Sequence, residues 1–352
     1  MEFYGTLGPA CASAEVLSRM LDAGMTGARL NLSHMGLSEA EPWLEALFNA
    51  GRSRGLRPEL LIDTQGPELR TGPLERPLCL AEGETLELGA GGLPLPERLI
   101  ELLEPGMRLL LDDGAMLLEV TAPRRARVLR GGTLGSRKGL TVEGLEYEAP
   151  PLTPRDCENL RAARDFGVTA VMQSFTRSAR DIAAVRSALG DAGIRVFAKV
   201  ESREGVEAMP ELLPASDMIV IARGDLGAAF GIYALPPLQK RLAAACRAAG
   251  APFMVVTQLL YSMQQNPVPT RAEVSDIYNA VLDGAAALML TNETAAGKYP
   301  SRPCAPSSSP PGQIHEHTGT ARDKRSACPG RFLFHAGIDE RGRLWYYLDG
   351  VT

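Results

Sequence analysis

The sequence predicts an α/β fold, a (β/α)8 TIM barrel with a small β-barrel domain inserted after the third strand. Eight short apolar runs alternate with Ala- and Leu-rich segments of helical spacing, a pattern typical of parallel βα units. A single stretch interrupts this alternation with shorter apolar runs separated by Gly and Pro. The 352 residues suffice for a barrel of roughly 250 residues with additions.

Composition and charge narrow the classes of partner. Hydrophobic residues make up 45% and charged residues 22% of the chain, as in soluble globular proteins. The net charge of −5 gives no reason to expect nucleic acid, although a local basic cluster still permits a small anionic substrate. We expect no signal peptide and no membrane span, because no basic start or run of 18 apolar residues occurs. The six cysteines form no C-x-x-C pair, so we expect a cytoplasmic location without disulfides or zinc.

The barrel elements are expected in residues 1–72 and 151–300. The helices between the strands include DIAAVRSALGDAG and PPLQKRLAAACRAAG, in which apolar residues recur at helical spacing before a Gly. The expected strands are Glu2–Leu7, Ala28–Leu32, Leu60–Asp63, Ala170–Ser174, Arg195–Glu201, Met218–Ala222, Phe253–Thr257 and Ala287–Thr291.

Two segments depart from this alternation. Residues 73–150 contain short alternating runs such as GETLELG and RRARVLRGG, which predict the inserted antiparallel β domain. Residues 301–352 begin with Pro and Ser clusters and are expected to be a linker or disordered. Within them, RFLFHAGIDERGRLWYYLDG is compatible with one hairpin, which is too short to form a core of its own.

Polar residues at the strand ends should converge, because the active site of such a barrel lies at the carboxyl ends of its strands. Lys199 and Glu201 stand two residues apart and therefore face the same side of their strand. Glu201 and Asp225, on neighbouring strands, form a carboxylate pair suited to Mg²⁺ or Mn²⁺. With Lys199 and Arg29 as cations, this set favours phosphoryl transfer or enolate chemistry. The other polar strand-end residues are Asn31, Ser33, His34, Asp63, Thr64, Arg223, Thr257, Gln258 and Glu293.

Each of these residues alone also has a plainer interpretation. A single Lys or Glu at a strand end is commonly just solvated, and Asn31 with Ser33 is also typical of a helix cap. His34 fits a structural hydrogen-bonding role equally well. The joint occurrence at successive strand ends is what favours a functional site.

At these residues the sequence resembles the pyruvate kinase family. The resemblance runs over about residues 3–300, in the order of the family's motifs, and implies phosphate transfer from phosphoenolpyruvate to ADP, giving pyruvate and ATP. The matching stretches include GTLGPACAS, GMTGARLNLSHMG, IDTQGPELRTG, GSRKGL, AKVESREGVE, IVIARGDLG, VVTQLLYSM and PTRAEVSDIYNAVLDGAAALMLTNETAAGKYP.

The resemblance also implies roles for individual residues. Lys199 and Arg29 would act on the transferring phosphoryl group, and Glu201 and Asp225 would hold Mg²⁺ or Mn²⁺. The backbone at Gly224 and Asp225 would take the substrate carboxylate, and Thr257 would lie where enolpyruvate is protonated. Implied K⁺ ligands are Asn31, Ser33, Asp63 and Thr64, with Glu68 of the type found in K⁺-dependent members, and implied nucleotide-binding residues are His34, Arg70 and Lys138.

The sequence also departs from the family's pattern. Gln65 stands where the family usually has Lys, and Val268 stands where Arg is common. The similarity ends at GKYP, so we expect the final barrel helix and the C-terminal regulatory domain to be missing. This leaves open a catalytically impaired, truncated paralogue or fragment, which a shortened gene or a frameshift would produce. A metal-dependent aldolase or lyase of pyruvate-enolate chemistry, and assembly into a homo-oligomer, also remain open.

Overall fold

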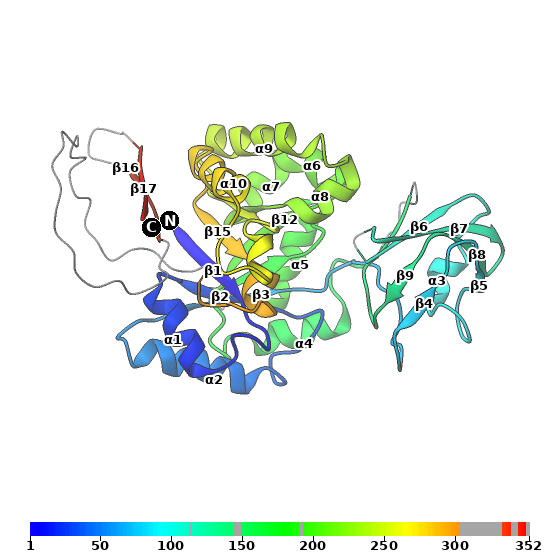
Figure 1. Cartoon of the computed structure of the whole chain (residues 1–352), viewed down its shortest axis with the longest axis horizontal. Helices are drawn as coiled ribbons and strands as arrows, with labels where there is room; N and C mark the ends of the chain where they lie inside the picture. Colours follow the sequence, from blue (N-terminus) through cyan, green and yellow to red (C-terminus); the bar gives the residue numbers. More distant parts are fainter. Residues whose placement is uncertain are drawn as a thin grey trace, which may run out of the picture.

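Eight parallel strands close into a barrel in the computed structural model, which describes residues 1–112, 114–143, 145, 149–190, 193–302, 333–338 and 344–349. Around the barrel the order is β1-β15-β14-β13-β12-β11-β3-β2, so each strand pairs with its sequence neighbours in the barrel. This confirms the predicted barrel, and every strand lies within one residue of its expected start and end (Figure 1). The barrel strands are β1 (Glu2–Thr6), β2 (Gly27–Asn31), β3 (Glu59–Asp63), β11 (Ala170–Gln173), β12 (Arg195–Val200), β13 (Met218–Ala222), β14 (Phe253–Val256) and β15 (Ala287–Leu290).

Helices surround the barrel, and local signals set where they begin and end. Thr153 and Thr270 begin α4 and α10 with reciprocal capping boxes, and Gly250 ends α9 in the left-handed conformation that glycine adopts without strain. The helices are α1 (Ala14–Asp22), α2 (Glu41–Arg52), α4 (Pro154–Ala162), α5 (Ala179–Leu189), α6 (Arg203–Glu207), α7 (Met209–Ala215), α8 (Arg223–Phe230), α9 (Leu235–Ala249), the 3-10 helix η1 (Tyr261–Gln264), α10 (Arg271–Leu282) and α11 (Asn292–Ala295).

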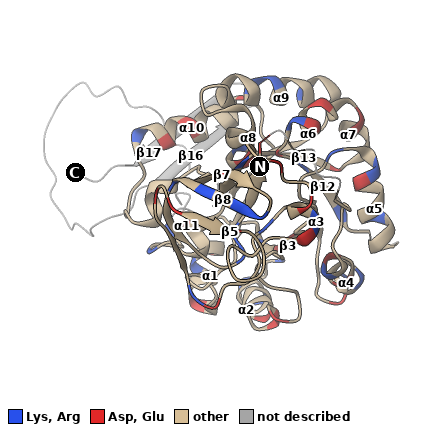
Figure 2. Cartoon of the chain, turned by 90° about the vertical axis from the view of Figure 1, so that its right-hand side faces the viewer, with Lys and Arg blue, Asp and Glu red and all other residues tan. Residues whose placement is uncertain are grey.

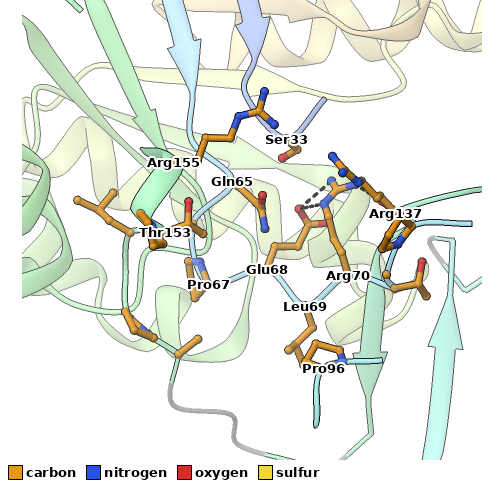
Figure 3. A pocket seen from close by; sticks show the side chains of 18 residues that line it. Ser33, Gln65, Pro67, Glu68, Leu69, Arg70, Pro96, Arg137, Thr153 and Arg155 are labelled. Carbon is orange, nitrogen blue, oxygen red and sulfur yellow. Dashed lines mark hydrogen bonds and ion pairs between the residues drawn. The ribbon is translucent and has the colours of Figure 1, made fainter. Parts of the chain in front are cut away.

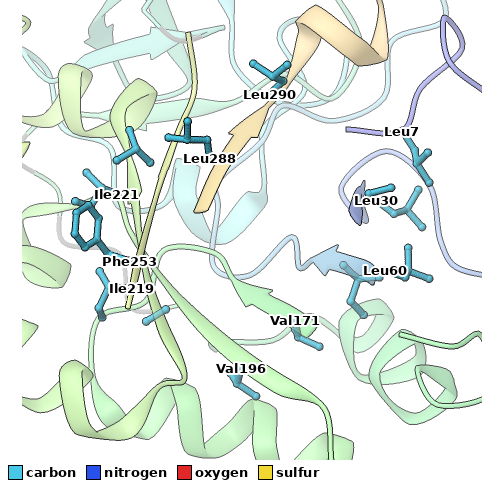
Figure 4. Close-up of a cluster of buried hydrophobic side chains, with 14 of the residues drawn as sticks. Leu7, Leu30, Leu60, Val171, Val196, Ile219, Ile221, Phe253, Leu288 and Leu290 are labelled. Atoms are coloured by element: carbon cyan, nitrogen blue, oxygen red, sulfur yellow. The ribbon is translucent and has the colours of Figure 1, made fainter. Parts of the chain in front are cut away.

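The barrel has two apolar layers. Inside it, Tyr4, Leu61, Phe197 and Met254 are buried and fill the interior. Outside it, the opposite faces of the same strands pack against the helices, and Figure 4 shows part of this larger cluster around Phe253. Each fully buried Leu, Ile or Phe side chain contributes roughly 1.5–3 kcal/mol, so the two layers hold the strand ends in fixed positions.

The inserted segment forms antiparallel β structure between β3 and α4. Its strands make an open five-stranded sheet, in the order β10-β6-β7-β8-β5, and a separate two-stranded sheet of β4 and β9. The expected closed β-barrel is therefore not formed among the described residues, because β4 and β9 pair with each other rather than with the ends of the larger sheet. The strands are β4 (Leu78–Leu80), β5 (Thr85–Glu87), β6 (Arg108–Leu111), β7 (Met116–Ala122), β8 (Arg125–Arg130), β9 (Gly132–Leu134) and β10 (Leu140–Val142), with the short helix α3 (Glu97–Ile100).

The inserted sheet has a hydrophobic core of its own, which includes Leu93, Leu109, Leu118 and Val128. Figure 1 places this sheet to one side of the barrel, and Figure 2, viewed from that side, shows it in front of the ring of helices. The strand β3 leads into the insertion from its carboxyl end, so the inserted sheet stands near the end of the barrel where the polar residues gather.

Beyond the barrel, β16 (Leu333–Ile338) and β17 (Leu344–Asp349) pair antiparallel, as the predicted hairpin requires. The sequence predicts that the tail at residues 301–352 is a linker or disordered, and its residues 303–332, 339–343 and 350–352 lie outside the described residues. No helix in the described part of the chain is long and apolar enough to cross a membrane.

Candidate active site

Four neighbouring strands bring Arg29, Asp63, Ser174 and Lys199 together at the carboxyl end of the barrel. Arg29 donates to Oδ2 of Asp63 through Nε at 3.0 Å and Nη2 at 2.5 Å. Lys199 Nζ lies 3.2 Å from the same oxygen and 3.2 Å from Oγ of Ser174. Asp63 is 1% exposed, so its charge is neutralised by these two cations rather than by water.

The carboxylates around Lys199 keep it charged. Burial by itself lowers the pKa of Lys199, but the charges of Asp63 and Glu201 outweigh this and raise the pKa above its usual value. For Asp63, burial raises the pKa, but the charges of Lys199 and Arg29 lower it by more. The pKa of Asp63 is therefore below its usual value. The site therefore holds a fixed ammonium and a fixed guanidinium against one buried carboxylate, which suits an anionic substrate.

Glu201 has one satisfied and one unsatisfied carboxylate oxygen. Its Oε1 accepts a 2.7 Å hydrogen bond from the backbone N–H of Phe175. Its Oε2 is buried 3.4 Å from Lys199 Nζ, yet no donor in the described part of the chain is aligned to hydrogen-bond it. Burial raises the pKa of Glu201, Lys199 opposes the rise, and the charge of Asp225 adds to it.

The unsatisfied Glu201 oxygen fits a divalent cation. Among the described residues, no group of three or more His, Cys, Asp or Glu side chains is placed to hold a metal. Mg²⁺ commonly binds through one or two carboxylates and takes its other ligands from water and substrate phosphate. Glu201 and Asp225 carry two such carboxylates, and the charge of Asp225 adds to the raised pKa of Glu201.

The first turn of α8 faces the end of β14. Arg223 is buried and donates to the carbonyl oxygen of Thr257 through Nη2 at 2.7 Å, while its Nη1 bonds Asp276 at 2.6 Å. Thr257 has a φ of 75°, an uncommon conformation for a β-branched residue. A Cβ on Gly224 would lie 3.0 Å from Thr257 Cγ2, so this glycine allows the helix start and Thr257 to approach closely.

A second group of cations lies where the barrel meets the inserted segment. Arg70 donates to Glu68 at 2.8 Å and to the carbonyl of Arg137 at 2.9 Å, and Lys138 pairs with Asp112 at 2.8 Å. Burial, and then the charges of Arg70, Arg29 and Lys138, lower the pKa of His34, so these four side chains share one electrostatic environment.

A cavity of about 410 Å³ opens beside this second group. Ser33 and Gln65 line it from the barrel, and Arg70 and Arg137 line it from the base of the inserted segment (Figure 3). Of the three predicted nucleotide-side residues, Arg70 lines this cavity, whereas His34 and Lys138 do not.

The predicted K⁺ ligands lie at the ends of the adjacent strands β2 and β3. Asn31 is aligned with Asp63 in the strand pairing, and its Oδ1 accepts a 3.1 Å hydrogen bond from the Ser33 amide. Residues 32–34 form turns rather than a helix, so the alternative role of Asn31 and Ser33 as a helix cap is wrong. Thr64 is buried and accepts a hydrogen bond from the Ser174 amide at 3.2 Å.

The structure also corrects the set of site residues. The sequence predicts Ser174 only as the last residue of a strand, yet its Oγ bonds Asp63 at 2.9 Å, the Thr64 carbonyl at 2.7 Å and Lys199 at 3.2 Å. Glu293, in contrast, caps local backbone by accepting from the amides of Leu260 and Thr291. A small polar residue directly after a strand was the only signal available for Ser174.

Comparison with known proteins agrees with this geometry. Residues 2–304 match the family model described as pyruvate kinase, barrel domain. The chain is 41% identical to the pyruvate kinase of Aeropyrum pernix over 85% of its own length and 68% of the relative's. It is 39% identical to pyruvate kinase from Geobacillus stearothermophilus and 38% identical to pyruvate kinase PKLR from Homo sapiens, over 84% of its length in both cases. It covers 53% and 56% of these two relatives, so it spans about half to two thirds of the curated proteins it resembles.

Proposed function

Because the chain belongs to the pyruvate kinase family, we propose that it transfers the phosphoryl group of phosphoenolpyruvate to ADP, giving pyruvate and ATP. The observation that carries this proposal is the buried cluster of Lys199, Arg29 and Asp63 beside the unsatisfied Oε2 of Glu201. Phosphoryl transfer needs positioning and charge stabilisation more than covalent chemistry, and this cluster supplies both.

Lys199 and Arg29 stabilise the transferring phosphoryl group. Both are charged and held in place by Asp63 before substrate arrives, so little reorganisation is required when negative charge develops. The substrate carboxylate binds the backbone amides of Gly224 and Asp225 in the first turn of α8, where helix N–H groups lack intrahelical partners.

Glu201 and Asp225 are the residues that hold Mg²⁺ or Mn²⁺. When bound, the divalent ion neutralises phosphate and enolate charge. Asn31, Ser33, Asp63 and Thr64 supply the oxygen atoms for K⁺, close to the same phosphate. Before the ion binds, Glu201 keeps its Oε2 out of contact with water and available to the ion at the substrate site.

Thr257 lies beside the enol carbon and positions its protonation. Its carbonyl is fixed by Arg223 and its side chain contacts the Gly224 position, so the residue has little freedom to move. On the other side of the site, His34, Arg70 and Lys138 bind the phosphates of ADP. We further propose that the protein acts in the cytoplasm and forms a homo-oligomer.

A coupled assay of pyruvate formation tests this function. We expect pyruvate from phosphoenolpyruvate only with ADP and Mg²⁺ both present, with stimulation by K⁺. Lys199→Met should abolish most turnover while leaving the fold intact. A folded wild-type protein that forms no pyruvate under these conditions contradicts the proposal and favours the impaired paralogue. Turnover of a 2-oxo acid without ADP favours the aldolase or lyase.

A further inference from the structure

One buried carboxylate joins both chain connections of the inserted segment. Asp156 is 1% exposed and lies in the first turn of α4. From the outgoing connection it accepts the backbone N–H groups of Gln65 at 2.9 Å and Gly66 at 3.1 Å. From the returning connection it accepts the N–H of Thr153 at 2.9 Å and its hydroxyl at 2.8 Å.

Helix capping accounts for only half of these contacts. A capping box consists of reciprocal bonds between Thr153 and Asp156, and those bonds are all present. The two bonds to Gln65 and Gly66 come from a segment about 90 residues away and add nothing to the cap. A second role is therefore needed to explain why one side chain holds both connections.

The outgoing connection leads directly to the nucleotide-side residues. Four residues after Gly66, Arg70 bonds the Arg137 carbonyl at 2.9 Å, and the N–H of Thr71 bonds the Lys138 carbonyl at 2.8 Å. Gly66 has a φ of 63°, and a Cβ there would meet the Ser174 carbonyl oxygen at 2.8 Å. The loop that Asp156 holds is thus packed tightly against the site on one side and paired with the inserted segment on the other.

The returning connection is tied to the barrel just before it reaches Asp156. Gln173 Nε2 donates to the Pro151 carbonyl at 2.6 Å, and Arg177 Nη2 donates to the Ala149 carbonyl at 2.8 Å. Both connections are therefore hydrogen-bonded to the barrel close to Asp156. A movement of the inserted sheet relative to the barrel would have to strain these bonds.

We propose that Asp156 is a positioning residue for the nucleotide side of the site. By holding both connections, its carboxylate sets where Arg70 and Lys138 stand over the barrel. This inference rests on the proposed function for its catalytic consequence, while its structural part is independent of turnover.

Three variants of the full chain separate positioning from capping. Asp156→Asn leaves one oxygen and turns an NH₂ group toward N–H donors, so it breaks the cap and the outgoing contacts together. Gly66→Ala disturbs the outgoing loop and leaves the capping box intact. Thr153→Ala is the matched control, since it removes the capping hydroxyl and keeps all three backbone N–H donors to Asp156.

Hydrogen exchange of the Gln65 and Gly66 amides and calorimetric binding of Mg·ADP are measured for each variant. We expect Asp156→Asn and Gly66→Ala to speed exchange at these amides at least tenfold, to weaken Mg·ADP binding about tenfold and to raise the KM for ADP similarly. The KM for phosphoenolpyruvate should change less than twofold in Asp156→Asn, and Thr153→Ala should behave as wild type. Should Asp156→Asn fail to fold, Gly66→Ala decides the question.

Two results overturn the proposal. One is unchanged exchange and Mg·ADP binding in Gly66→Ala, and the other is an equal change in Thr153→Ala, which would make Asp156 a helix cap only. A wild-type protein without turnover contradicts the proposed function and leaves this proposal standing. Hydrogen exchange and Mg·ADP binding do not depend on turnover, so they still test the role of Asp156.

Discussion

Lys199 Nζ lies 3.2 Å from Oδ2 of Asp63, the same oxygen that accepts two hydrogen bonds from Arg29. The two cations are therefore held in place by one buried carboxylate, and Lys199 also lies 3.4 Å from Oε2 of Glu201. The two cations at the barrel end favour an anionic substrate, and each member of the cluster can be tested by substitution.

Replacement of Lys199 should separate catalysis from folding. We expect Lys199→Met to reduce kcat by roughly 10²–10³, the usual effect of losing a preorganised group at developing charge. Arg29 remains bonded to Asp63, so the cluster keeps one cation and the variant should still melt cooperatively. Lys240→Met is the control, because Lys240 is half exposed and pairs with Asp283 rather than with a member of the cluster. Equal loss of activity in both variants would contradict the assignment.

The close approach of Gly224 to Thr257 should make an added methyl group harmful. In Gly224→Ala the new Cβ would stand 3.0 Å from Thr257 Cγ2, and Arg223 prevents the Thr257 backbone from moving away. We expect kcat to fall at least tenfold. Gly227→Ala in the same helix is the matched control, since its Cβ meets Leu235 Cδ2 at an ordinary 3.7 Å. Steady-state kinetics of the two alanine variants compare them directly, and equal rates would show that the contact does not matter.

Part of the site could be predicted from the sequence, and part could not. The strand ends that carry Lys199 and Thr257 could be predicted from sequence, because buried parallel strands are apolar runs with abrupt polar ends. The roles of Ser174 and Asp156 could not, because their partners lie about 90 to 110 residues away in the chain. Glu293 is the opposite case, since its position at a strand end favours a site residue although its carboxylate accepts from backbone amides.

Apolar and polar alternation predicts the β structure of the inserted segment for a similar reason, but it does not determine whether the strands close into a barrel. Alternation of apolar and polar residues indicates which face of each strand is buried, and Leu109, Leu118 and Val128 are indeed buried. The pattern contains no information on which strand pairs with which. The separate pairing of β4 with β9 therefore appears only in the structure.

Glu68 should make stability depend on pH. Burial raises the pKa of Glu68 from 4.5 to about 7, with the Arg70 charge opposing the rise. A carboxyl whose pKa is higher in the folded state contributes stability below 4.5 that is lost as pH rises toward 7, at most about 3 kcal/mol. In metal-free buffer, the free energy of unfolding of wild type should fall relative to Glu68→Gln between pH 5 and pH 8.

Glu39 provides the control for this measurement. The Gly36 amide and the Arg155 charge lower the pKa of Glu39, so any stability that it contributes is already complete above pH 5. The difference between wild type and Glu39→Gln should therefore stay constant over the same range. A Glu68 difference that is equally flat would show that this carboxyl is not desolvated in solution.

Thiol reactivity should follow burial. Burial raises the pKa of the Cys11 and Cys246 thiols to about 11, and both side chains are inaccessible, whereas Cys79 is exposed on β4. Because the thiolate is the reactive form, iodoacetamide at pH 8 should modify Cys79 in the native protein and leave Cys11 and Cys246 unmodified. Peptide mass spectrometry after labelling identifies the modified residues, and labelling in urea confirms that all three thiols react once the chain unfolds. Native labelling of Cys11 at a rate near that of Cys79 would mean that the start of the barrel opens in solution, because Cys11 bonds the carbonyl groups of Thr6 and Gly8 at the end of β1.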